Sequence, residues 1–391
     1  MIDNETYFDY AATSPISDEC AKILRTSLEE SILLSANPSS PHSAGKKAKA
    51  RLESARESCA KALGVKSNQI FFTSGGTESD HIALLCAIMQ ESKGRIAVSS
   101  LEHPAVREFS KNLSRFCLGI DEIESDENGF ITEESVQKKL FPETKLVSVM
   151  AVNNETGAVM PIQNIAEKIR AHYNGKRRAH FHSDCVQAVG KIEMDFLGWG
   201  IDSASISLHK LGGPRGFGIL FVSESQKFRT FLSGGGQESG IRSGTENLFG
   251  AICAEKILEK RIFKAGAENP RLKKQTELTA HFIDSLTKIE GCSIVPTTRN
   301  AKSADFSPWI LQAAFKGIPG NVLVRALDAK GFCISTGSAC SSKKLNRPIL
   351  QAMKISQETQ SEAVRFSFGH ETTENGMKKL LEAIKEIRAS F

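Results

Sequence analysis

The stretch QIFFTSGGTESDHIALLCAIM, residues 69–89, decides the fold. Its first four residues are mostly apolar and are typical of a short buried strand. A glycine-rich turn follows at residues 73–77. Apolar side chains then recur at the spacing of one helix face, at Ile82, Leu85, Cys86 and Met89. A strand, a glycine-rich turn and a helix in this order predict the first βα unit of an α/β fold.

Strands and helices continue to alternate on both sides of this unit. Upstream, residues 46–63 carry apolar side chains on one helical face, and Gly64 is expected to end that helix. Downstream, Pro161 is expected to open another helix. Apolar runs that predict strands lie at residues 95–99, 145–151, 179–183, 203–207 and 216–222. This alternation predicts a mostly parallel sheet covered by helices on both faces, with ligands bound outside the carboxyl ends of its strands.

The pattern changes after the charged helical stretch that begins at residue 251. Helices and short strands are then mixed, as in an α+β domain, at residues 272–289, 309–315, 322–331 and 373–387. A chain of 391 residues is long enough for one large and one smaller domain. We therefore predict a large α/β domain at residues 13–262 and a small α+β domain made of residues 1–12 and 263–391.

The composition argues against several classes of protein. Hydrophobic residues make up 40% of the chain and charged residues 24%, as in an ordinary soluble globular protein. The 50 Lys and Arg residues exceed the 45 Asp and Glu residues only slightly and form no basic run, so direct nucleic-acid binding is not expected. The N-terminus lacks an apolar signal region and no run of 18 apolar residues occurs, so we expect neither secretion nor membrane insertion. The 9 cysteines include no Cys-x-x-Cys pair, which favours reduced thiols in a cytoplasmic protein and no metal site.

Two residues and one turn, each directly after a predicted strand, could together hold a phosphorylated cofactor. Lys210 ends the run SLHK beside a glycine-rich turn and is a candidate Schiff-base lysine. The turn at residues 74–77 opens a helix, where free backbone N–H groups favour a phosphate. Asp184 is a candidate for the carboxylate that pyridoxal phosphate needs against its ring nitrogen. The three features form a set that is consistent with pyridoxal phosphate.

Eight segments resemble those of the cysteine desulfurases, in the same order and at similar spacing from end to end. They are FFTSGGTESD (71–80), LEHPAV (101–106), VNNETGAV (152–159), HSDCVQAVGK (182–191), SLHKLGGPRGFG (207–218), GGGQESGIRSGT (234–245), STGSACSS (335–342) and RFSFG (365–369). The GSAC form is similar to that of the iron–sulfur-cluster branch of this class-V aminotransferase-like family. The resemblance implies a fold-type I, aspartate aminotransferase-like large domain with a mixed, mostly parallel sheet.

The resemblance also implies the catalytic roles. Lys210 matches the lysine that holds pyridoxal 5'-phosphate as a Schiff base, and His103 matches the histidine that stacks on the ring and serves as acid or base. Asp184 matches the carboxylate on the ring nitrogen, and Gln187 matches the amide near the ring hydroxyl. Cys340 matches the nucleophile that receives sulfur.

Other matched positions imply binding roles. The phosphate contacts would come from Gly76, Thr77, Ser207 and His209. Thr245 matches a phosphate contact donated by the other subunit of a homodimer. Asn154 matches a residue that meets cofactor and substrate, and Arg365 matches the arginine that binds the substrate α-carboxylate through two N–H groups.

The implied reaction converts L-cysteine to L-alanine and leaves the sulfur as a persulfide on Cys340. A sulfur-acceptor protein, either a cluster scaffold or a tRNA-thiolation enzyme, would then take the sulfur. The small and polar residues around Cys340 predict a mobile loop suited to that delivery. An ordinary thiol is only a small fraction thiolate at neutral pH, so local activation of Cys340 is expected.

Three other interpretations stay open. An aminotransferase of the same fold would use Lys210 and Asp184 without needing Cys340, and a selenocysteine lyase could use the same site. A catalytically silent scaffold is the third, although every expected catalytic position is retained. The chain departs from the family pattern in local packing positions, at Cys185, Gly212, Gln237 and His370.

Overall fold

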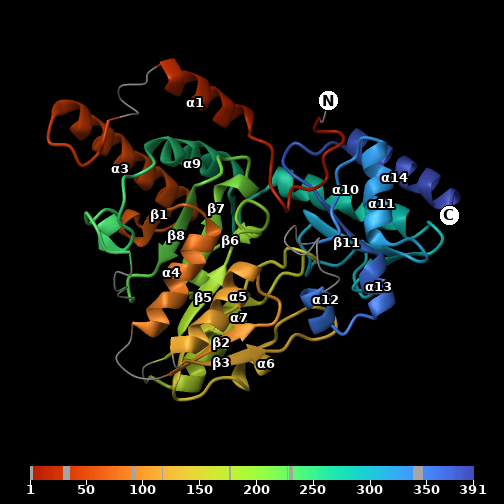
Figure 1. Cartoon of the computed structure of the whole chain (residues 1–391), viewed down its shortest axis with the longest axis horizontal. Helices are drawn as coiled ribbons and strands as arrows, with labels where there is room; N and C mark the ends of the chain where they lie inside the picture. The colour runs from red at the N-terminus through yellow and green to blue at the C-terminus, as the bar shows by residue number, and fades with distance from the viewer. Residues whose placement is uncertain are drawn as a thin grey trace.

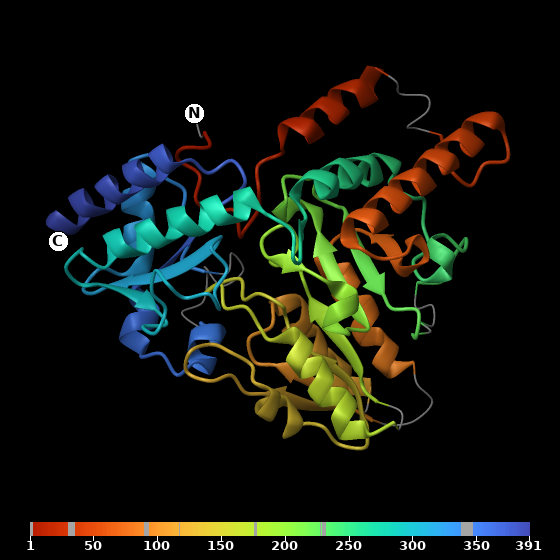
Figure 2. The same cartoon turned by 180° about the vertical axis from the view of Figure 1, so that it is seen from behind.

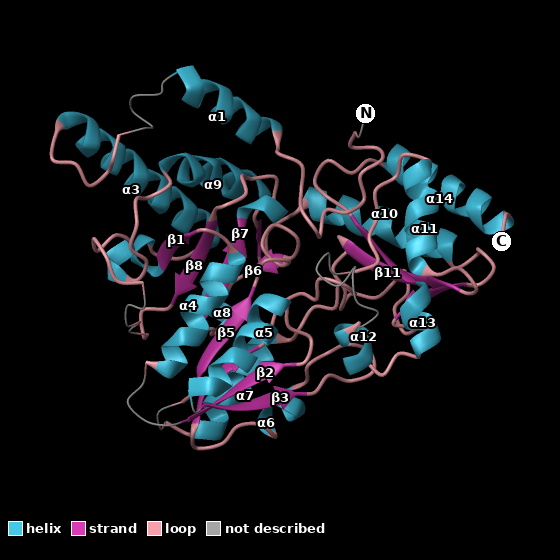
Figure 3. Ribbon diagram, in the orientation of Figure 1, coloured by secondary structure: helices cyan, strands magenta, loops and turns pink. Residues whose placement is uncertain are grey.

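The computed structural model describes residues 3–29, 36–89, 94–116, 118–175, 178–226, 228, 232–337 and 347–391. The chain forms two lobes, one around a large central sheet and one around a small sheet that lies closer to the C-terminus (Figures 1 and 3). Figure 2 shows the same two lobes from behind, with the N-terminal segment passing between them before it reaches the first helix. The two lobes are therefore in contact along the path of this segment.

The central sheet has seven strands in the order β1-β8-β7-β5-β4-β2-β3. Their bounds are Ile70–Thr73 (β1), Gly94–Ser99 (β2), Leu118–Ile123 (β3), Thr144–Ser148 (β4), His180–Asp184 (β5), Ser203–Ser207 (β7) and Gly218–Val222 (β8). Neighbouring strands from β3 to β7 pair in parallel, whereas β8 is antiparallel to both β1 and β7. The sheet is mixed and mostly parallel, which confirms the predicted fold class.

Helices cover both faces of this sheet, and every residue of β1, β5, β7 and β8 is buried. Helices α4 (Gly76–Ile88) and α5 (Pro104–Leu113) lie in front of the sheet in Figure 1, and α7 (Ile162–Tyr173) lies in front of it in Figure 2. Helices α1 (Asp18–Glu29) and α3 (Ser43–Leu63) pack against α9 (Leu248–Arg261). The short helices of this lobe are α6 (Glu133–Gln137), α8 (Phe196–Trp199) and the 3-10 turns η1 (Ser67–Gln69), η2 (Ser114–Phe116), η3 (Leu208–Lys210) and η4 (Glu238–Gly240).

The small lobe is built on an antiparallel sheet of three strands in the order β10-β11-β12. Their bounds are Cys292–Val295 (β10), Ile310–Phe315 (β11) and Ala363–Ser367 (β12). Its helices are α10 (Pro270–Leu286), α11 (Gly320–Ala329), α12 (Pro348–Ala352), α13 (Gln357–Glu362) and α14 (Glu374–Ala389). A two-stranded parallel pair, β6 (Glu193–Met194) and β9 (Phe263–Lys264), joins the two parts of the chain.

Glycine and proline mark the ends or starts of helices at positions that the sequence predicts. Gly64 follows α3 with a φ of 72°, and its N–H bonds to the last carbonyls of the helix. Pro161 directly precedes α7 as its N-cap residue. The strand predicted at residues 145–151 is shorter, because β4 ends at Ser148, although Val149 and Ala151 still donate backbone hydrogen bonds to β5.

Each lobe has its own main hydrophobic cluster. The larger lies between the central sheet and its helices and includes Leu52, Val147 and Ile206. The second fills the small lobe around Trp309, and the N-terminal Phe8 packs into it. The division at residues 13–262, with 1–12 and 263–391 in the second domain, stays a prediction. Within the described parts of the chain, no helix has both the length and the apolar character required to cross a membrane.

Candidate active site

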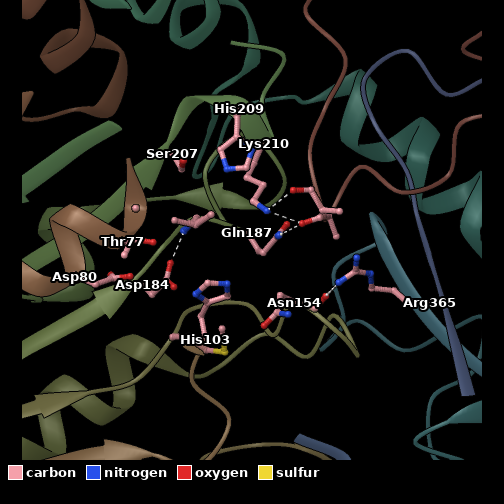
Figure 4. A pocket seen from close by; sticks show the side chains of 15 residues that line it. Thr77, Asp80, His103, Asn154, Asp184, Gln187, Ser207, His209, Lys210 and Arg365 are labelled. Carbon is pink, nitrogen blue, oxygen red and sulfur yellow. Dashed lines mark hydrogen bonds between the residues drawn. The ribbon is translucent and has the colours of Figure 1, made fainter. Parts of the chain in front are cut away.

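A cavity of about 240 Å³ lies where the carboxyl ends of the central strands meet β12 of the small lobe (Figure 4). The parallel strands bring their ends to one edge of the sheet, where ligands of α/β folds bind. The cavity is lined by Ala11, Ala12, Gly76, Thr77, Asp80, His103, Met150, Asn154, Asp184, Val186, Gln187, Ser207, His209, Lys210 and Arg365. Ten of the residues proposed from the sequence thus line one cavity. They lie in, or follow, six strands that belong to two sheets.

Lys210 reaches the cavity from the 3-10 turn that follows β7. Its Nζ donates to the backbone carbonyls of Ala11 and Ala12, both at 2.8 Å. The N-terminal segment is held to the same turn by Ser14, whose Oγ donates to the carbonyl of Lys210 at 2.9 Å. The carbonyls of Ala11 and Ala12 thereby hold the amine at the cavity wall.

Asp184, the last residue of β5, places a carboxylate at the floor of the cavity with only 4% of its surface exposed. Its Oδ1 accepts from the backbone N–H of Val186 at 2.9 Å. Burial, together with the negative charge of Asp80, raises the pKa of Asp184 to about 8. Burial also lowers the pKa of the neighbouring His182 to about 4, so this imidazole is neutral at pH 7 and supplies no counter-charge. The carboxylate form of Asp184 therefore needs a positive partner inside the cavity.

The N-terminus of α4 forms the part of the cavity wall next to Asp184 (Figure 4). Gly76 and Thr77 present backbone N–H groups there, and the 13-residue helix adds its dipole. A Cβ on Gly76 would lie 2.6 Å from a methyl of Val186, so glycine is required for this close approach. Burial and the charge of Lys210 lower the pKa of His209 to about 4, so above that pH it is a neutral hydrogen-bonding group. Together with Ser207, these groups form a cradle suited to an anion.

His103 caps the N-terminus of α5. Its Nδ1 accepts from the backbone N–H of Ala105 at 3.2 Å, which leaves the ring proton on Nε2. Burial, and then the positive charges of Lys210 and Arg107, lower the pKa of His103 to about 4. The histidine is therefore neutral at pH 7 and can donate from Nε2.

Arg365 enters the cavity from β12, with 2% of its surface exposed. Its Nη1 donates to the carbonyl of Asn154 at 2.9 Å, and its Nη2 donates to Asp9 at 2.8 Å. Its Nε and the side-chain oxygen of Asn154 are both buried and have no hydrogen-bond partner among the described residues. Unsatisfied buried polar atoms on a cavity wall are positions at which a polar ligand can bind.

These observations test whether the cavity fits pyridoxal phosphate. A protonated ring nitrogen would give the carboxylate of Asp184 a positive partner, and a phosphate would suit the cradle at Gly76. Lys210 lines the same cavity as these groups (Figure 4). The donor set therefore fits the cofactor.

Two predicted residues are not part of this arrangement. Cys340 belongs to residues 338–346, which lie outside the described residues, so the structure does not place it. Thr245 is described, but it is exposed and does not line the cavity. A contact of Thr245 with a phosphate in a neighbouring subunit stays a prediction.

The sequence interpretation missed two features of the cavity. Asp80 is 1% exposed, accepts from His182 Nε2 at 3.2 Å, and burial raises its pKa to about 7. Asp80 lies three residues after Thr77 and therefore on the same face of α4, and this spacing could have indicated that it lines the cavity. The other feature is the N-terminal segment, whose carbonyls hold Lys210 and whose Asp9 holds Arg365.

The four departures from the family pattern are accommodated by their surroundings. Gly212 has a φ of 77°, which favours glycine over the aromatic residue of the family. His370 stacks on Trp309 with a ring-centroid distance of 5.0 Å and contacts the carbonyl of Gly190 at 2.9 Å. Cys185 is fully buried, and the side chain of Gln237 accepts from the N–H of Gly244 at 3.0 Å.

The chain matches the model of the aminotransferase class-V family over residues 6–380. It therefore belongs to the class-V aminotransferase family and depends on pyridoxal phosphate, in agreement with the cavity. Within that family, relatives that match almost the whole chain are named cysteine desulfurase. A cysteine desulfurase IscS of Dictyoglomus turgidum is 36% identical over 386 residues, which covers 98% of this chain and 94% of the relative. A cysteine desulfurase IscS of Clostridium botulinum is 33% identical over 392 residues, which covers 99% and 95%.

A comparison with a solved structure also shows similarity over the whole chain. A NifS-like protein superimposes with a TM-score of 0.88 at 30% identity, covering 100% of both chains. The similarity thus extends over both lobes.

Proposed function

We propose that this protein is a cysteine desulfurase that converts L-cysteine to L-alanine and transfers the sulfur to Cys340 as a persulfide. The observation that carries the proposal is the cavity in which Lys210, the buried Asp184 and Arg365 converge. Relatives named cysteine desulfurase that cover almost the whole chain support it. A further solved structure, 28% identical with a TM-score of 0.77 and covering 93% of this chain and 98% of its own, is of SspA in complex with cysteine.

Each residue of the cavity would have a separate chemical role. Pyridoxal phosphate, when bound, supplies an electron sink for the negative charge that develops on the substrate α-carbon. Asp184 would hold the ring nitrogen, Gln187 would face the ring hydroxyl, and Lys210 would form the Schiff base and then take the α-proton once its amine is released. His103, neutral at pH 7 with its proton on Nε2, would stack on the ring and donate.

The cradle and the small lobe would bind the two ends of the ligand. Gly76, Thr77, Ser207 and His209 would bind the phosphate. Asn154 and Arg365 would bind the substrate, with the guanidinium on its α-carboxylate.

The sulfur step transfers one atom to the enzyme. The Cys340 thiolate attacks the substrate sulfur, and the bond between that sulfur and Cβ breaks with its electron pair remaining on carbon. The carbon fragment takes up protons and leaves as alanine, while Cys340 keeps the sulfur as a persulfide. A sulfur-acceptor protein of the cytoplasm, serving iron–sulfur cluster assembly or tRNA thiolation, would then remove it.

The reaction class is tested by adding L-cysteine to purified protein with a reductant and assaying alanine and sulfide together. Equal amounts of alanine and sulfide are expected, because each turnover releases one of each. Formation of pyruvate, or of alanine without sulfide, would contradict the proposed function.

Replacement of Arg365 is expected to weaken use of the substrate. A charge-assisted pair contributes about 1.5–3 kcal/mol, so Arg365→Ala should lower kcat/KM for L-cysteine by roughly ten- to a hundredfold. Arg365→Lys should be nearly as harmful, because lysine lacks the planar pair of donors. Cysteamine, which has no carboxylate, is the matched control substrate, and its slow turnover should be little affected. An unchanged kcat/KM for L-cysteine in Arg365→Ala would exclude this role.

The protein is expected to act as a homodimer in which Thr245 completes the phosphate site of the partner. Obligate interfaces of this kind bury about 2,000–5,000 Å². Mixed dimers of Lys210→Ala and Thr245→Asp subunits test the arrangement, because one of their two sites would contain both native residues. Activity should reappear after the two inactive variants are mixed and reassociated. Failure to recover activity in confirmed mixed dimers, or full activity in a monomer by light scattering, would contradict it.

A further inference from the structure

Lys191 is a buried lysine that no step of the proposed reaction uses. It lies seven residues after Asp184, has 3% of its surface exposed, and is not among the residues that line the cavity. Its Nζ donates to Oε1 of Gln187, and among the described residues no carboxylate lies within ion-pair distance of it. A buried amine normally requires a charged partner, so its single amide partner needs an explanation.

The amide of Gln187 is held from both sides. Its Nε2 donates to the carbonyl of Ala11 at 2.9 Å, and its Oε1 accepts from Lys191. The Ala11 carbonyl can only accept, and the amine of Lys191 donates on the other side, so the two contacts together fix the nitrogen of the amide on the side of Ala11. The reversed amide would set two oxygens against each other at Ala11 and would turn its N–H groups toward the amine of Lys191.

This arrangement determines what Gln187 offers to the cavity. Nε2 carries two hydrogens, of which one is bound to Ala11, so the second N–H remains available on a side chain that lines the cavity. The same Ala11 carbonyl accepts from Lys210 at 2.8 Å. The orientation of Gln187 and the position of Lys210 are therefore linked through one backbone atom.

We propose that Lys191 is a positioning residue of the active site, which locks Gln187 so that an N–H, and not the carbonyl oxygen, faces the ring hydroxyl of the cofactor. This rests on the proposed function, in which Gln187 lies near that hydroxyl. A donor at this position stabilises negative charge on the ring oxygen and thereby favours the deprotonated form of the lysine–cofactor linkage.

The charge of Lys191 is not required for this role. Burial, and then the positive charges of Lys210 and Arg365, lower the pKa of Lys191 well below its ordinary value. Both the protonated and the neutral amine carry hydrogens, so either form can donate to Oε1 of Gln187. The lock therefore holds on both sides of the Lys191 titration.

The test is a pH titration of the visible absorption of the cofactor-loaded protein without substrate. Lys191→Met leaves Oε1 of Gln187 without its donor, and should raise the apparent pKa of the lysine–cofactor linkage by about 0.5–1 unit, the equivalent of one hydrogen bond. Gln187→Met should cause a similar rise, and the double variant should show no further rise. Lys385→Met, at an exposed position of α14, is the matched control and should leave the pKa unchanged. The other charged or titratable groups around Lys210 are unchanged in all variants, namely Asp80, His103, Asp184, His209 and Arg365.

The double variant separates an effect through Gln187 from a direct charge effect. If Lys191→Met raises the pKa equally with and without Gln187, the amine acts through its charge and the proposed lock is wrong. No shift in Lys191→Met would also overturn it. Lys191→Leu, which also removes the donor, enters the same cycle if Lys191→Met does not fold, and must likewise show no additive effect. An unloaded wild-type protein, or one that forms no alanine and sulfide, would instead contradict the proposed function.

Discussion

Cys340→Ala is expected to abolish sulfide release from L-cysteine while the fold and the bound cofactor stay intact. Removing a catalytic nucleophile lowers turnover by roughly a thousandfold or more, because no remaining group can form the covalent intermediate. The variant should still bind pyridoxal phosphate and L-cysteine, since none of the residues that line the cavity is changed. Mass spectrometry should detect a persulfide on the wild-type protein and none on the variant.

The described residues that flank Cys340 support its role. Ser335 forms a β-bridge with Arg365, and Gly337 lies so close to Glu155 that a Cβ would come within 2.8 Å of its carboxylate. Arg347, at the other end of the segment, donates to the same carboxylate at 3.3 Å. Ser335 and Arg347, on the two sides of Cys340 in the sequence, therefore both contact β12, the strand that carries Arg365.

Cys333 is the matched control for this prediction. It lies seven residues earlier, its backbone pairs with the N-terminal segment at Thr6 and Phe8, and burial raises the pKa of its thiol. Cys333→Ala should therefore retain sulfide release, because a thiol with a raised pKa is a poor nucleophile at neutral pH. Alanine and sulfide formed at the wild-type rate by Cys340→Ala would show that the proposed sulfur step is wrong.

The parts of the fold that the sequence predicts are those with local signals. The apolar run before Ser74 and the glycine turn after it predict β1 and α4 without reference to the rest of the chain. Strand β3 was missed, because its sequence LGIDEI contains a glycine and two adjacent acidic residues and it pairs at the edge of the sheet. Helix α1 was missed as well, although it is amphipathic and, with 12 residues, as long as α7.

The candidate site also contains some residues that local sequence patterns predict and some contacts that they do not predict. Residues directly after strands, such as Asp184 and Lys210, are predictable because parallel strands bring their ends together. The contact between Asp9 and Arg365 joins residues that are 356 positions apart, and no local pattern indicates it. The carbonyls of Ala11 and Ala12 are backbone atoms, which every sequence contains, so their part in holding Lys210 appears only in three dimensions.

Lys210→Ala is the second change that should remove activity almost completely, by roughly a thousandfold or more. The wild-type protein should be yellow, and borohydride should fix the cofactor covalently on the peptide that contains Lys210. The variant should lose both properties, because the amine that is proposed to form the linkage and to take the α-proton is gone. Absorption spectra and peptide mass spectrometry after reduction measure the two effects.

Lys191 makes this a demanding test, because it is another lysine close to the same cavity and is itself buried. The two amines differ in what they contact: Nζ of Lys210 reaches the cavity wall at Ala11 and Ala12, whereas Nζ of Lys191 is turned to Gln187 and its side chain does not line the cavity. A buried amine needs access to the ligand before it can react with a carbonyl, however low its pKa. Lys191→Met should therefore still yield the reduced adduct on Lys210. An adduct found on Lys191, or on any other lysine of the wild-type protein, would show that Lys210 has been assigned the wrong role.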